Sequence, residues 1–481
     1  MRIIIASAEV APFARVGGLS DVVGALPKEI AAAGHDVSVF LPKYADIDDD
    51  RFGIEAVPGA GDLKVPGSGK EPVSLYSCPL PGAPAVTVYM IRYDPFFDRG
   101  GIYVDPTTKK GYPDEVERYA LFSRGLLEAA RVLKLNPDVL HLNDHHTALA
   151  GVYLREFYAD DPVLSSAGTV FSIHNLGYLG TFESALLPKL GFKEEHCTYG
   201  SAFEYKGGVS TLKLGIEYSD YVNTVSERYA EEIAGSPEFG HGLEGVLAEK
   251  RDAGRLKGIL NGVDYSVWDP AVDELIPAQY SRADMAGKER CRTELRARTG
   301  LRDDATVPLI GMVSRLADQK GFDLLREVAS DIVDLGAQLV VLGTGQEEYH
   351  EFLKALSLRH PGAVSANLAF DNELAHWIEA GSDMFLMPSL YEPCGLNQMY
   401  SLRYGTVPIV RATGGLVDTV TDYDAEAGRG VGFVFAEYDS AEMLTAIARS
   451  VETYADRDAW AGLMARGMAL DFSWKSSARA Y

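Results

Sequence analysis

The stretch MFLMPSLYEPCGLNQMYSLRYGTVPIVRATGGLVDTV spans residues 384–420 and places two apolar runs on either side of a helical segment. The apolar runs are Met384–Met387 and Val407–Val410, and the helical segment is Leu396–Tyr404. Short apolar strands that alternate with helices are typical of parallel sheets covered by helices on both faces. This stretch therefore predicts an α/β fold.

The same alternation recurs in two series along the chain. Each series is about the size of a nucleotide-binding domain, which favours two doubly wound, Rossmann-like domains over one closed barrel. We expect a first domain over residues 1–258, a second over residues 259–458, and a helical tail over residues 459–481 that packs back on the first. Ligands of such sheets bind beyond the carboxyl ends of the strands, so two domains facing each other would enclose a cleft. The apolar runs of the first series are Ile3–Ala6, Val37–Leu41, Val86–Ile91, Val139–Leu142, Val170–Ile173 and Tyr221–Val225, and those of the second are Leu309–Val313, Leu339–Leu342, Met384–Met387, Val407–Val410 and Gly432–Phe435.

The chain of 481 residues is acidic, with 45 Lys and Arg residues against 69 Asp and Glu residues and a formal net charge of -24. Proteins that bind nucleic acids or anionic membranes usually present a basic surface that neutralises phosphates. The charge therefore argues against both kinds of partner, and an anionic ligand would need a local basic pocket.

Cysteine usage and apolar content indicate a cytoplasmic protein. The four cysteines, Cys78, Cys197, Cys291 and Cys394, form no CxxC pair, so we expect neither a zinc knuckle nor a disulfide framework. No stretch approaches the roughly 18 uncharged apolar residues of a membrane span. The apolar run in MRIIIASAEV is too short for a signal peptide, and we expect a first strand there.

Two glycine pairs, Gly17–Gly18 and Gly414–Gly415, each open the pattern G-G-L-x-D-x-V before an apolar helical run. Paired glycines let a backbone approach a ligand, and a helix N-terminus offers N–H groups to an anion. The alternative is a simple helix entry. In the first copy, Asp21 either complements the helix dipole or faces a substrate hydroxyl.

Charged side chains follow two strands of the second series. Arg315 and Lys320 come directly after Leu309–Val313, where a guanidinium beside an ammonium suits a diphosphate, and a solvated or salt-bridged pair is the alternative. Glu392 lies between a buried strand and a helix, where a carboxylate can accept hydrogen bonds from sugar hydroxyls. Its alternative role is to cap that helix.

Polar side chains also follow two strands of the first series. His141, Asn143, Asp144, His145 and His146 surround the end of Val139–Leu142, and Ser172, His174 and Asn175 surround the end of the next strand. The spacing is not HExxH and no third ligand is evident, so we expect contacts to a polar ligand rather than a metal. No GxSxG motif anchors a hydrolase triad.

Together these segments resemble the bacterial glycogen synthases and plant starch synthases, retaining glucosyltransferases of family 5 with the two-domain GT-B architecture. The resemblance runs along the whole chain. The matching segments are AEVAPFARVGGLSDVVGALP, HLNDHHTAL, SIHNLGYLG, NTVSERYAEEI, GILNGVDYSVWDP, SRLADQKGFDLL, LGTGQEEY, MPSLYEPCGLNQMYSLRYGTVPIVRATGGLVDTV and DFSW.

The resemblance implies transfer of glucose from ADP-glucose to the non-reducing 4-hydroxyl of an α-1,4-glucan, with retention of configuration. It implies no metal and no pyridoxal phosphate. The implied residues fall into three groups. The catalytic group consists of Glu392, His174, Arg315 and Lys320. The donor-binding group consists of Arg315, Lys320 and Glu392 together with Arg15, Gly17, Gly18, Cys394, Gly395, Leu396, Thr413, Gly414 and Gly415. The group that would line the sugar cleft consists of His174, Asp21, Asp144, Asn175 and Asn261.

Breaking a glycosyl phosphate bond develops negative charge on the leaving diphosphate, and fixed cations there lower the barrier. No motif places a second carboxylate opposite Glu392, and Tyr400 stands where some related enzymes have one. We therefore expect front-face, internal-return transfer rather than a covalent glucosyl intermediate.

The chain departs from the family pattern at several positions. Arg15 replaces a lysine, His145 replaces a Trp or another large residue, Leu390–Tyr391 replace Arg and Phe, and Pro113–Glu115 depart from a DN pattern. These departures keep alternatives open: a relative that uses UDP-glucose or another acceptor, or a non-catalytic glucan-binding relative. A glucan phosphorylase would need a lysine that holds pyridoxal phosphate. The acceptor that the resemblance implies is a neutral polysaccharide, which needs no basic surface.

Overall fold

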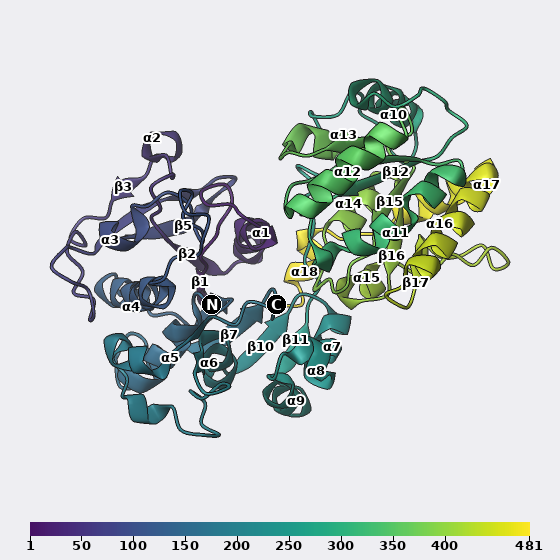
Figure 1. Cartoon of the computed structure of the whole chain (residues 1–481). Helices are drawn as coiled ribbons and strands as arrows, with labels where there is room; N and C mark the ends of the chain where they lie inside the picture. The colour runs from purple at the N-terminus through teal and green to yellow at the C-terminus, as the bar shows by residue number, and fades with distance from the viewer. The chain divides into compact units, whose positions relative to one another are not determined.

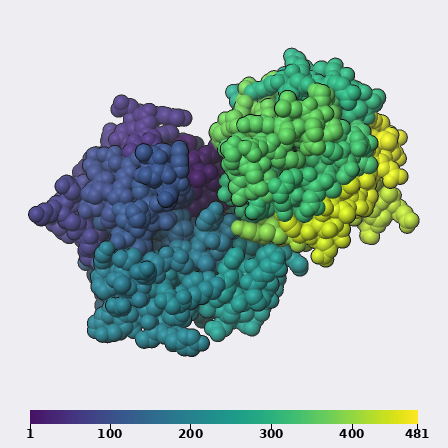
Figure 2. Space-filling view, viewed as in Figure 1, coloured from purple at the N-terminus to yellow at the C-terminus, as the bar shows by residue number.

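The computed structural model describes residues 1–481, which form two units (Figure 1). The first consists of Met1–Val225, Ala230–Ile259 and Ala478–Tyr481, and the second of Ser226–Tyr229 and Leu260–Ser477, so the chain passes between the units four times. The passage at residues 259 and 260 lies beside the expected boundary. The tail differs from the expectation, because residues 459–477 belong to the second unit and only Ala478–Tyr481 join the first. The space-filling view shows a continuous surface of packed side chains on each unit (Figure 2).

The first unit contains a nine-stranded sheet in the order β11-β10-β7-β6-β1-β2-β5-β4-β3. The strands from β11 to β5 pair in parallel, and β4 and β3 extend the edge in antiparallel pairing. The chain order runs outward in opposite directions from β1 and β6, so the switch point lies between these two strands. The bounds are β1 Arg2–Ala6, β2 Asp36–Pro42, β3 Glu55–Ala56, β4 Ser74–Leu80, β5 Ala83–Arg92, β6 Val139–Asn143, β7 Gly168–Ile173, β10 Tyr221–Thr224 and β11 Leu256–Gly258, with a separate hairpin of β8 Thr181–Phe182 and β9 Val209–Ser210.

Helices pack on this sheet because its inner strands are apolar on both sides. Ile3, Ile4 and Ile5 of β1 are all buried. The helix α1 packs on β2 and β5, and α5 packs on β6. The helices are α1 Gly18–Ala32, α2 Asp49–Phe52, α3 Asp94–Phe97, α4 Glu115–Val132, α5 Ala148–Phe157, α6 Thr211–Tyr218, α7 Glu227–Gly235, α8 Pro237–Gly240 and α9 Glu244–Asp252, with 3₁₀ turns η1 Ser184–Leu190 and η2 Glu194–His196.

The second unit contains a six-stranded parallel sheet in the order β14-β13-β12-β15-β16-β17. This is the doubly wound order of a nucleotide-binding domain, with its switch point between β12 and β15. The strands are β12 Leu309–Val313, β13 Gln338–Leu342, β14 Val364–Asn367, β15 Met384–Met387, β16 Val407–Arg411 and β17 Phe433–Phe435.

Both faces of this sheet are covered, as the alternation along β13 shows. Leu339 and Val341 join a core with α11, α12, α16 and α17. Val340 and Leu342 join a core on the opposite face with α10 and α13. The helices are α10 Ala286–Thr299, α11 Phe322–Asp334, α12 Glu347–Arg359, α13 Asn372–Gly381, α14 Asn397–Arg403, α15 Gly414–Thr419, α16 Ser440–Ala455, α17 Arg457–Gly467 and α18 Trp474–Ala478, with the 3₁₀ turn η3 Asp318–Lys320.

The predicted α/β class with two Rossmann-like domains is confirmed, and every apolar run of the two series overlaps a strand of one of the two sheets. The strands that the apolar runs missed are short or polar: β3, β8, β9, β11 and β14, together with β4, which lies next to the edge strand β3. None of the helices has both the length and the apolar content needed to cross a membrane.

Candidate active site

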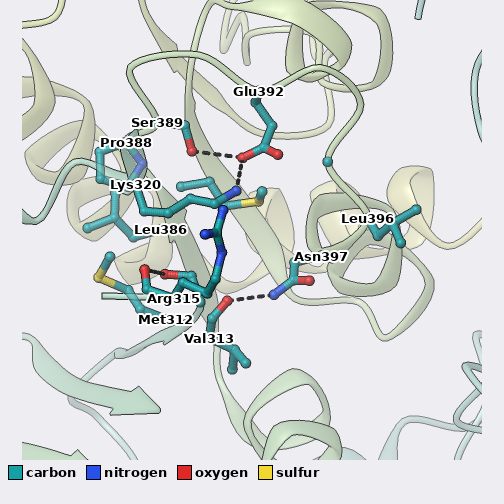
Figure 3. A pocket seen from close by; sticks show the side chains of 13 residues that line it. Met312, Val313, Arg315, Lys320, Leu386, Pro388, Ser389, Glu392, Leu396 and Asn397 are labelled. Carbon is teal, nitrogen blue, oxygen red and sulfur yellow. Dashed lines mark hydrogen bonds and ion pairs between the residues drawn. The ribbon is translucent and has the colours of Figure 1, made fainter. Parts of the chain in front are cut away.

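A pocket lies at the switch point of the second unit, past the carboxyl ends of β12 and β15 (Figure 3). This is where a doubly wound sheet binds its ligand, because neighbouring strands send their chains to opposite faces there. Five of the predicted site residues line it: Arg315, Lys320, Glu392, Gly395 and Leu396.

Lys320 and Glu392 form an ion pair in this pocket. The Nζ atom of Lys320 lies 2.5 Å from Oε2 of Glu392, and the hydroxyl of Ser389 donates to the same oxygen at 2.9 Å. Figure 3 shows both groups directed at the Glu392 carboxylate. Glu392 does not cap α14, whose N-cap is Leu396. The helix-cap alternative for Glu392 is therefore wrong.

Arg315 remains exposed at the end of β12 and has no carboxylate within ion-pair distance. Its guanidinium donates only to Oε1 of Gln319, at 3.3 Å. A cation at a strand end without a counter-charge is available to an anionic ligand. Of the alternative expected for this pair, Lys320 is salt-bridged, whereas Arg315 is solvated and without a carboxylate partner.

Gly321 explains why the loop of Lys320 lies against the loop of Glu392. Its φ is +75°, and a Cβ atom there would stand 2.1 Å from the carbonyl oxygen of Pro388. The N–H of Leu390 donates to the carbonyl of Gln319 at 2.9 Å, and the Gln319 amide donates to the carbonyl of Tyr391. These bonds use main-chain atoms of Leu390 and Tyr391, so the departure of these two side chains from the family pattern leaves them intact.

The second glycine pair packs against the main chain of Glu392. Gly414 opens α15 with a φ of +45°, and a Cβ atom on it would stand 2.0 Å from the carbonyl oxygen of Glu392. The N–H of Gly415 donates to that carbonyl at 3.1 Å, and a Cβ atom on Gly415 would meet the carbonyl of Cys394 at 2.1 Å. The pair is a helix entry, and its close packing fixes the main chain around Glu392.

Cys394, Asn261 and Thr413 are buried beside this packing. Asn261 hydrogen-bonds to the Cys394 thiol, and burial raises the pKa of that thiol to about 12. The thiol is therefore protonated and unreactive at neutral pH. The Oδ1 atom of Asn261 and the hydroxyl of Thr413 are buried without a hydrogen-bond partner.

The first unit has its own switch point between β1 and β6, and a buried glutamate organises the loop after β1. Glu9 accepts hydrogen bonds from the N–H groups of Val16 and Gly17, at 2.6 and 2.8 Å, and from the hydroxyl of Tyr103 at 2.6 Å. Burial raises the pKa of the Glu9 carboxyl, which the three donors oppose. Sequence reasoning assigned Glu9 no role, although an acidic residue right after a buried strand was a signal.

Glu9 fixes the turn that carries Arg15 and the first glycine pair. Gly17 caps α1, and Gly18 is the first residue of that helix. A guanidinium nitrogen of Arg15 lies 3.1 Å from a carboxylate oxygen of Asp21, and both side chains are partly exposed. The structure therefore places Arg15, Gly17, Gly18 and Asp21 together at one helix N-terminus.

Asp144 and His174 meet at the ends of β6 and β7. Asp144, with a φ of +56°, accepts the main-chain N–H of His174 at 2.8 Å and also that of Asn175. The Nε2 atom of His174 lies 2.9 Å from Oδ1 of Asn143. Burial raises the pKa of Asp144 to about 6 and lowers the pKa of His174 to about 3, so the imidazole is neutral near pH 7.

Two Rossmann-like units with such ligand sites at their switch points define a glycosyltransferase of the GT-B class. The family model for the starch synthase catalytic domain matches residues 2–249, and that for glycosyl transferases group 1 matches residues 292–461. The chain belongs to the family of glycogen and starch synthases.

The relatives that carry this assignment match over their full length. A glycogen synthase of Koribacter versatilis is 44% identical over 100% of this chain and 97% of its own. A glycogen synthase of Anaeromyxobacter sp. is also 44% identical, over 100% of this chain and 98% of its own. The catalytic domain of starch synthase IV from Arabidopsis thaliana, solved with ADP and acarbose, has a TM-score of 0.90 and 33% identity over 100% of this chain and 97% of its own. A sucrose-phosphate synthase from Thermosynechococcus elongatus, at 18% identity and a TM-score of 0.58 over 99% of this chain and 96% of its own, shares the fold.

Proposed function

We propose that this chain transfers glucose from ADP-glucose to the non-reducing 4-hydroxyl of an α-1,4-glucan, with retention of configuration. The observation that carries the proposal is the pocket at the switch point of the second unit, where Arg315, Lys320 and Glu392 converge. The full-length relatives named glycogen synthase, and the starch synthase solved with ADP, support the same reaction. The reaction takes place in the cytoplasm, where the donor and a neutral glucan are the partners.

The two cations have separate roles in this reaction. Arg315 has no carboxylate to release and binds the donor diphosphate as a planar fork. Lys320 divides its interaction between Glu392 and the leaving diphosphate, so its charge is held in place before the bond breaks. The resemblance to the family gives Arg15 a further cationic role in donor binding.

Glu392 binds the donor glucose rather than attacking it. It is the only carboxylate among the residues that line the pocket, and its Oε2 atom is already engaged by Lys320 and Ser389. An engaged carboxylate is a poor nucleophile, which favours front-face transfer within an ion pair. A glucosyl adduct trapped on any side chain would overturn this part of the proposal.

His174 and Asp144 position the reacting sugar from the first unit. The Asp144 carboxylate fixes the main chain at His174, and the neutral imidazole is oriented by Asn143. The carbonyl of His174 then stabilises the positive charge that develops on the sugar. Arg315 and Lys320 supply the charge that the leaving diphosphate needs in the pocket of the second unit, so the transfer requires neither a metal ion nor pyridoxal phosphate.

Transfer of labelled glucose tests the proposal. The purified chain is incubated with glycogen and with ADP-glucose or UDP-glucose that carries ¹⁴C in the sugar, and the label in precipitated glycogen is measured. We expect faster incorporation from ADP-glucose. A preference for UDP-glucose would overturn the donor assignment, and no incorporation with intact glycogen binding would identify a non-catalytic glucan-binding protein.

A further inference from the structure

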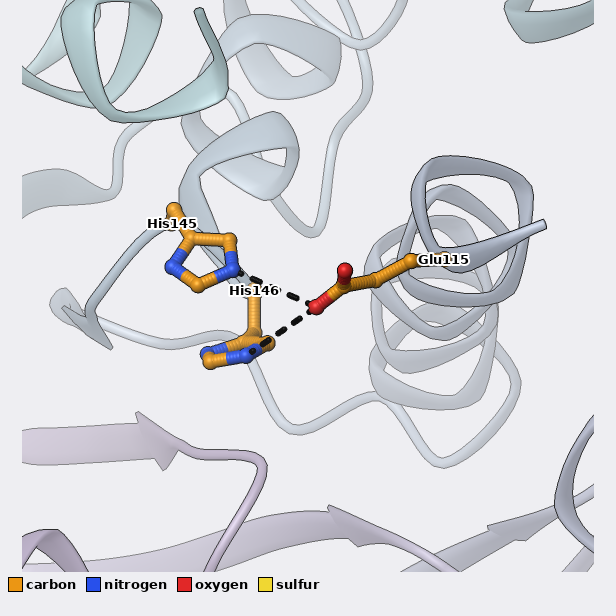
Figure 4. Close-up of side chains that lie close together, drawn as sticks. All are labelled: Glu115, His145 and His146. Carbon is orange, nitrogen blue, oxygen red and sulfur yellow. Dashed lines mark ion pairs between the residues drawn. The ribbon is translucent and has the colours of Figure 1, made fainter. Parts of the chain in front are cut away.

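Three ligand-type side chains of the first unit converge outside the pocket described above (Figure 4). Glu115 is the first residue of α4, and His145 and His146 lie in the loop between β6 and α5. The Nε2 atoms of His145 and His146 lie 3.5 and 3.8 Å from the same oxygen, Oε1 of Glu115. The ligand atoms of all three residues lie within 4.8 Å of one another.

These distances fit a shared metal ion better than direct hydrogen bonds. A nitrogen–oxygen hydrogen bond is about 2.7–3.2 Å long, which is shorter than both separations. Zinc binds imidazole nitrogen and carboxylate oxygen at about 2.0–2.2 Å, so the ligand atoms of a tetrahedral site are about 3.4 Å apart. The two separations between a histidine nitrogen and the Glu115 oxygen exceed that value by a few tenths of an ångström, which small side-chain rotations can close.

The His146 imidazole is buried, the His145 imidazole is mostly buried, and both are held by ring packing. The His146 ring stacks on Tyr103 at 4.8 Å between centroids, meets Tyr119 at 4.6 Å, and lies 3.6 Å from the His145 ring. The Nδ1 atoms of both histidines are buried without a hydrogen-bond partner. The Nε2 atoms are therefore the polar atoms through which these rings interact, and both are directed at Glu115 (Figure 4).

The charges around the cluster suit a neutral-imidazole ligand set. Burial lowers the pKa of His146 well below its usual value, and His145 and the nearby Arg118 lower it further. A neutral imidazole keeps the lone pair that a metal needs. Two imidazoles with one carboxylate bind borderline ions such as Zn²⁺, with a fourth position left for water.

Two of the three ligands stand where this sequence departs from the pattern of its family. Glu115 falls in the segment that lacks the usual DN pattern, and His145 replaces a large residue that is usually Trp. The two departures come from segments far apart in sequence, and the structure brings them into contact.

We propose that Glu115, His145 and His146 bind one divalent transition-metal ion of the Zn²⁺ class. The ion ties the start of α4 to the loop that carries Asp144, and it borders a second cavity lined by Tyr119, Tyr178 and Thr211. Its role is to hold these segments together, and the proposed glucosyl transfer does not use it. The proposal replaces the expectation, drawn from the sequence, that no metal binds here.

Calorimetric titration of the chelator-treated full chain with Zn²⁺ alone tests the site. We expect one ion per chain with a dissociation constant of micromolar or below, and at least tenfold weaker binding for Glu115→Gln and for His145→Gln. His360→Gln, in the second unit, is the matched control and should bind as the unchanged chain does. Equal binding by all four proteins, or no binding at all, would overturn the proposal.

Two further readouts separate metal binding from a loss of fold. Bound Co²⁺ should give the visible absorption bands of a four-coordinate site in the unchanged chain and not in Glu115→Gln. Zn²⁺ should raise the melting temperature of the unchanged chain by several degrees and leave that of the two variants where it was. Variants that match the unchanged chain in metal-free melting temperature but still gain the full Zn²⁺ shift would contradict the assignment of these ligands.

Discussion

Lys320 holds Glu392 through a 2.5 Å ion pair past the carboxyl ends of β12 and β15 in the second unit. The sequence alone indicated a cation and an acid at two strand ends, because each follows an apolar run. The apolar pattern by itself could not indicate that they meet, because 72 residues separate them and only the folded sheet brings β12 and β15 side by side; the resemblance to the family is what placed both in one site. The same limit hid Glu9, whose partner Tyr103 is 94 residues away.

Replacing Lys320 by alanine should cut turnover about hundredfold or more, the usual effect of losing one preorganised charge from a transition state. Melting temperature should stay within a few degrees of the unchanged chain, since the side chain is partly exposed. Lys354→Ala removes an exposed lysine of α12 and is the matched control. Steady-state rates with ADP-glucose and glycogen measure both, and a near-normal rate for Lys320→Ala would remove this residue from the site.

Replacing Glu9 by alanine should loosen the turn that carries Arg15. The N–H groups of Val16 and Gly17 would lose their acceptor, which costs about 1–3 kcal/mol for each buried group that stays unpaired. We expect a lower melting temperature and a raised KM for the donor. Glu9→Gln keeps one oxygen for the two amides and should lie close to the unchanged chain; if both variants behave alike, the carboxylate does not hold the turn.

At the level of elements, the fold was predictable where a strand is apolar on both faces. β12, β13, β15 and β16 are such strands, and the sequence indicated all four. It missed β11, Leu256–Gly258, and β14, Val364–Asn367, because a short edge strand buries little and carries no apolar run. It indicated both helix entries at the glycine pairs, and for the second pair the structure adds the reason, which is contact between main chains.

That contact predicts different outcomes for two glycines of the second unit. Gly414→Ala and Gly428→Ala both place a Cβ atom at positive φ, +45° and +60°, but only at Gly414 would it strike a neighbouring carbonyl. Gly414→Ala should therefore lower the unfolding free energy by about 1–3 kcal/mol more than Gly428→Ala. It should also lower activity sharply, because Glu392 moves. Urea unfolding and rate measurements compare the pair, and equal effects would show that the packing is not needed.

Glu379, a buried acid of α13 that faces Ser401 of α14, makes the stability of the chain depend on pH. Burial raises the pKa of Glu379 to about 8, and its only hydrogen bond comes from Ser401. Since the folded pKa lies above the unfolded one, the unchanged chain loses stability as the pH rises from about 4.5 to 8. The side chain in Glu379→Gln stays neutral at every pH. The free energy of unfolding of this variant should therefore rise relative to that of the unchanged chain across this window, by on the order of 2–4 kcal/mol at pH 7.5. Urea unfolding at pH 5 and 7.5 measures the difference, and a constant difference would contradict the raised pKa.

For the whole molecule, tryptophan fluorescence can follow ligand binding in the second unit alone. All four tryptophans, Trp268, Trp377, Trp460 and Trp474, belong to the second unit. ADP at a hundredfold excess over its dissociation constant should stabilise that unit by about 2.7 kcal/mol. The urea midpoint seen by tryptophan fluorescence should rise, and the rise should shrink in Lys320→Ala. An unchanged midpoint at saturating ADP would place the nucleotide outside the second unit.

The four passages of the chain between the units matter for anyone who wishes to exchange domains between relatives. Neither unit is a single continuous segment, because Ser226–Tyr229 of the early chain belongs to the second unit and Ala478–Tyr481 belongs to the first. In the first unit, Tyr481 accepts a hydrogen bond from Asn223, and its ring lies 5.6 Å from that of His141. A chimera joined only at residue 260 would therefore combine each half with foreign pieces of the other. An exchange that preserves both cores must carry the last four residues with the N-terminal half and Ser226–Tyr229 with the C-terminal half.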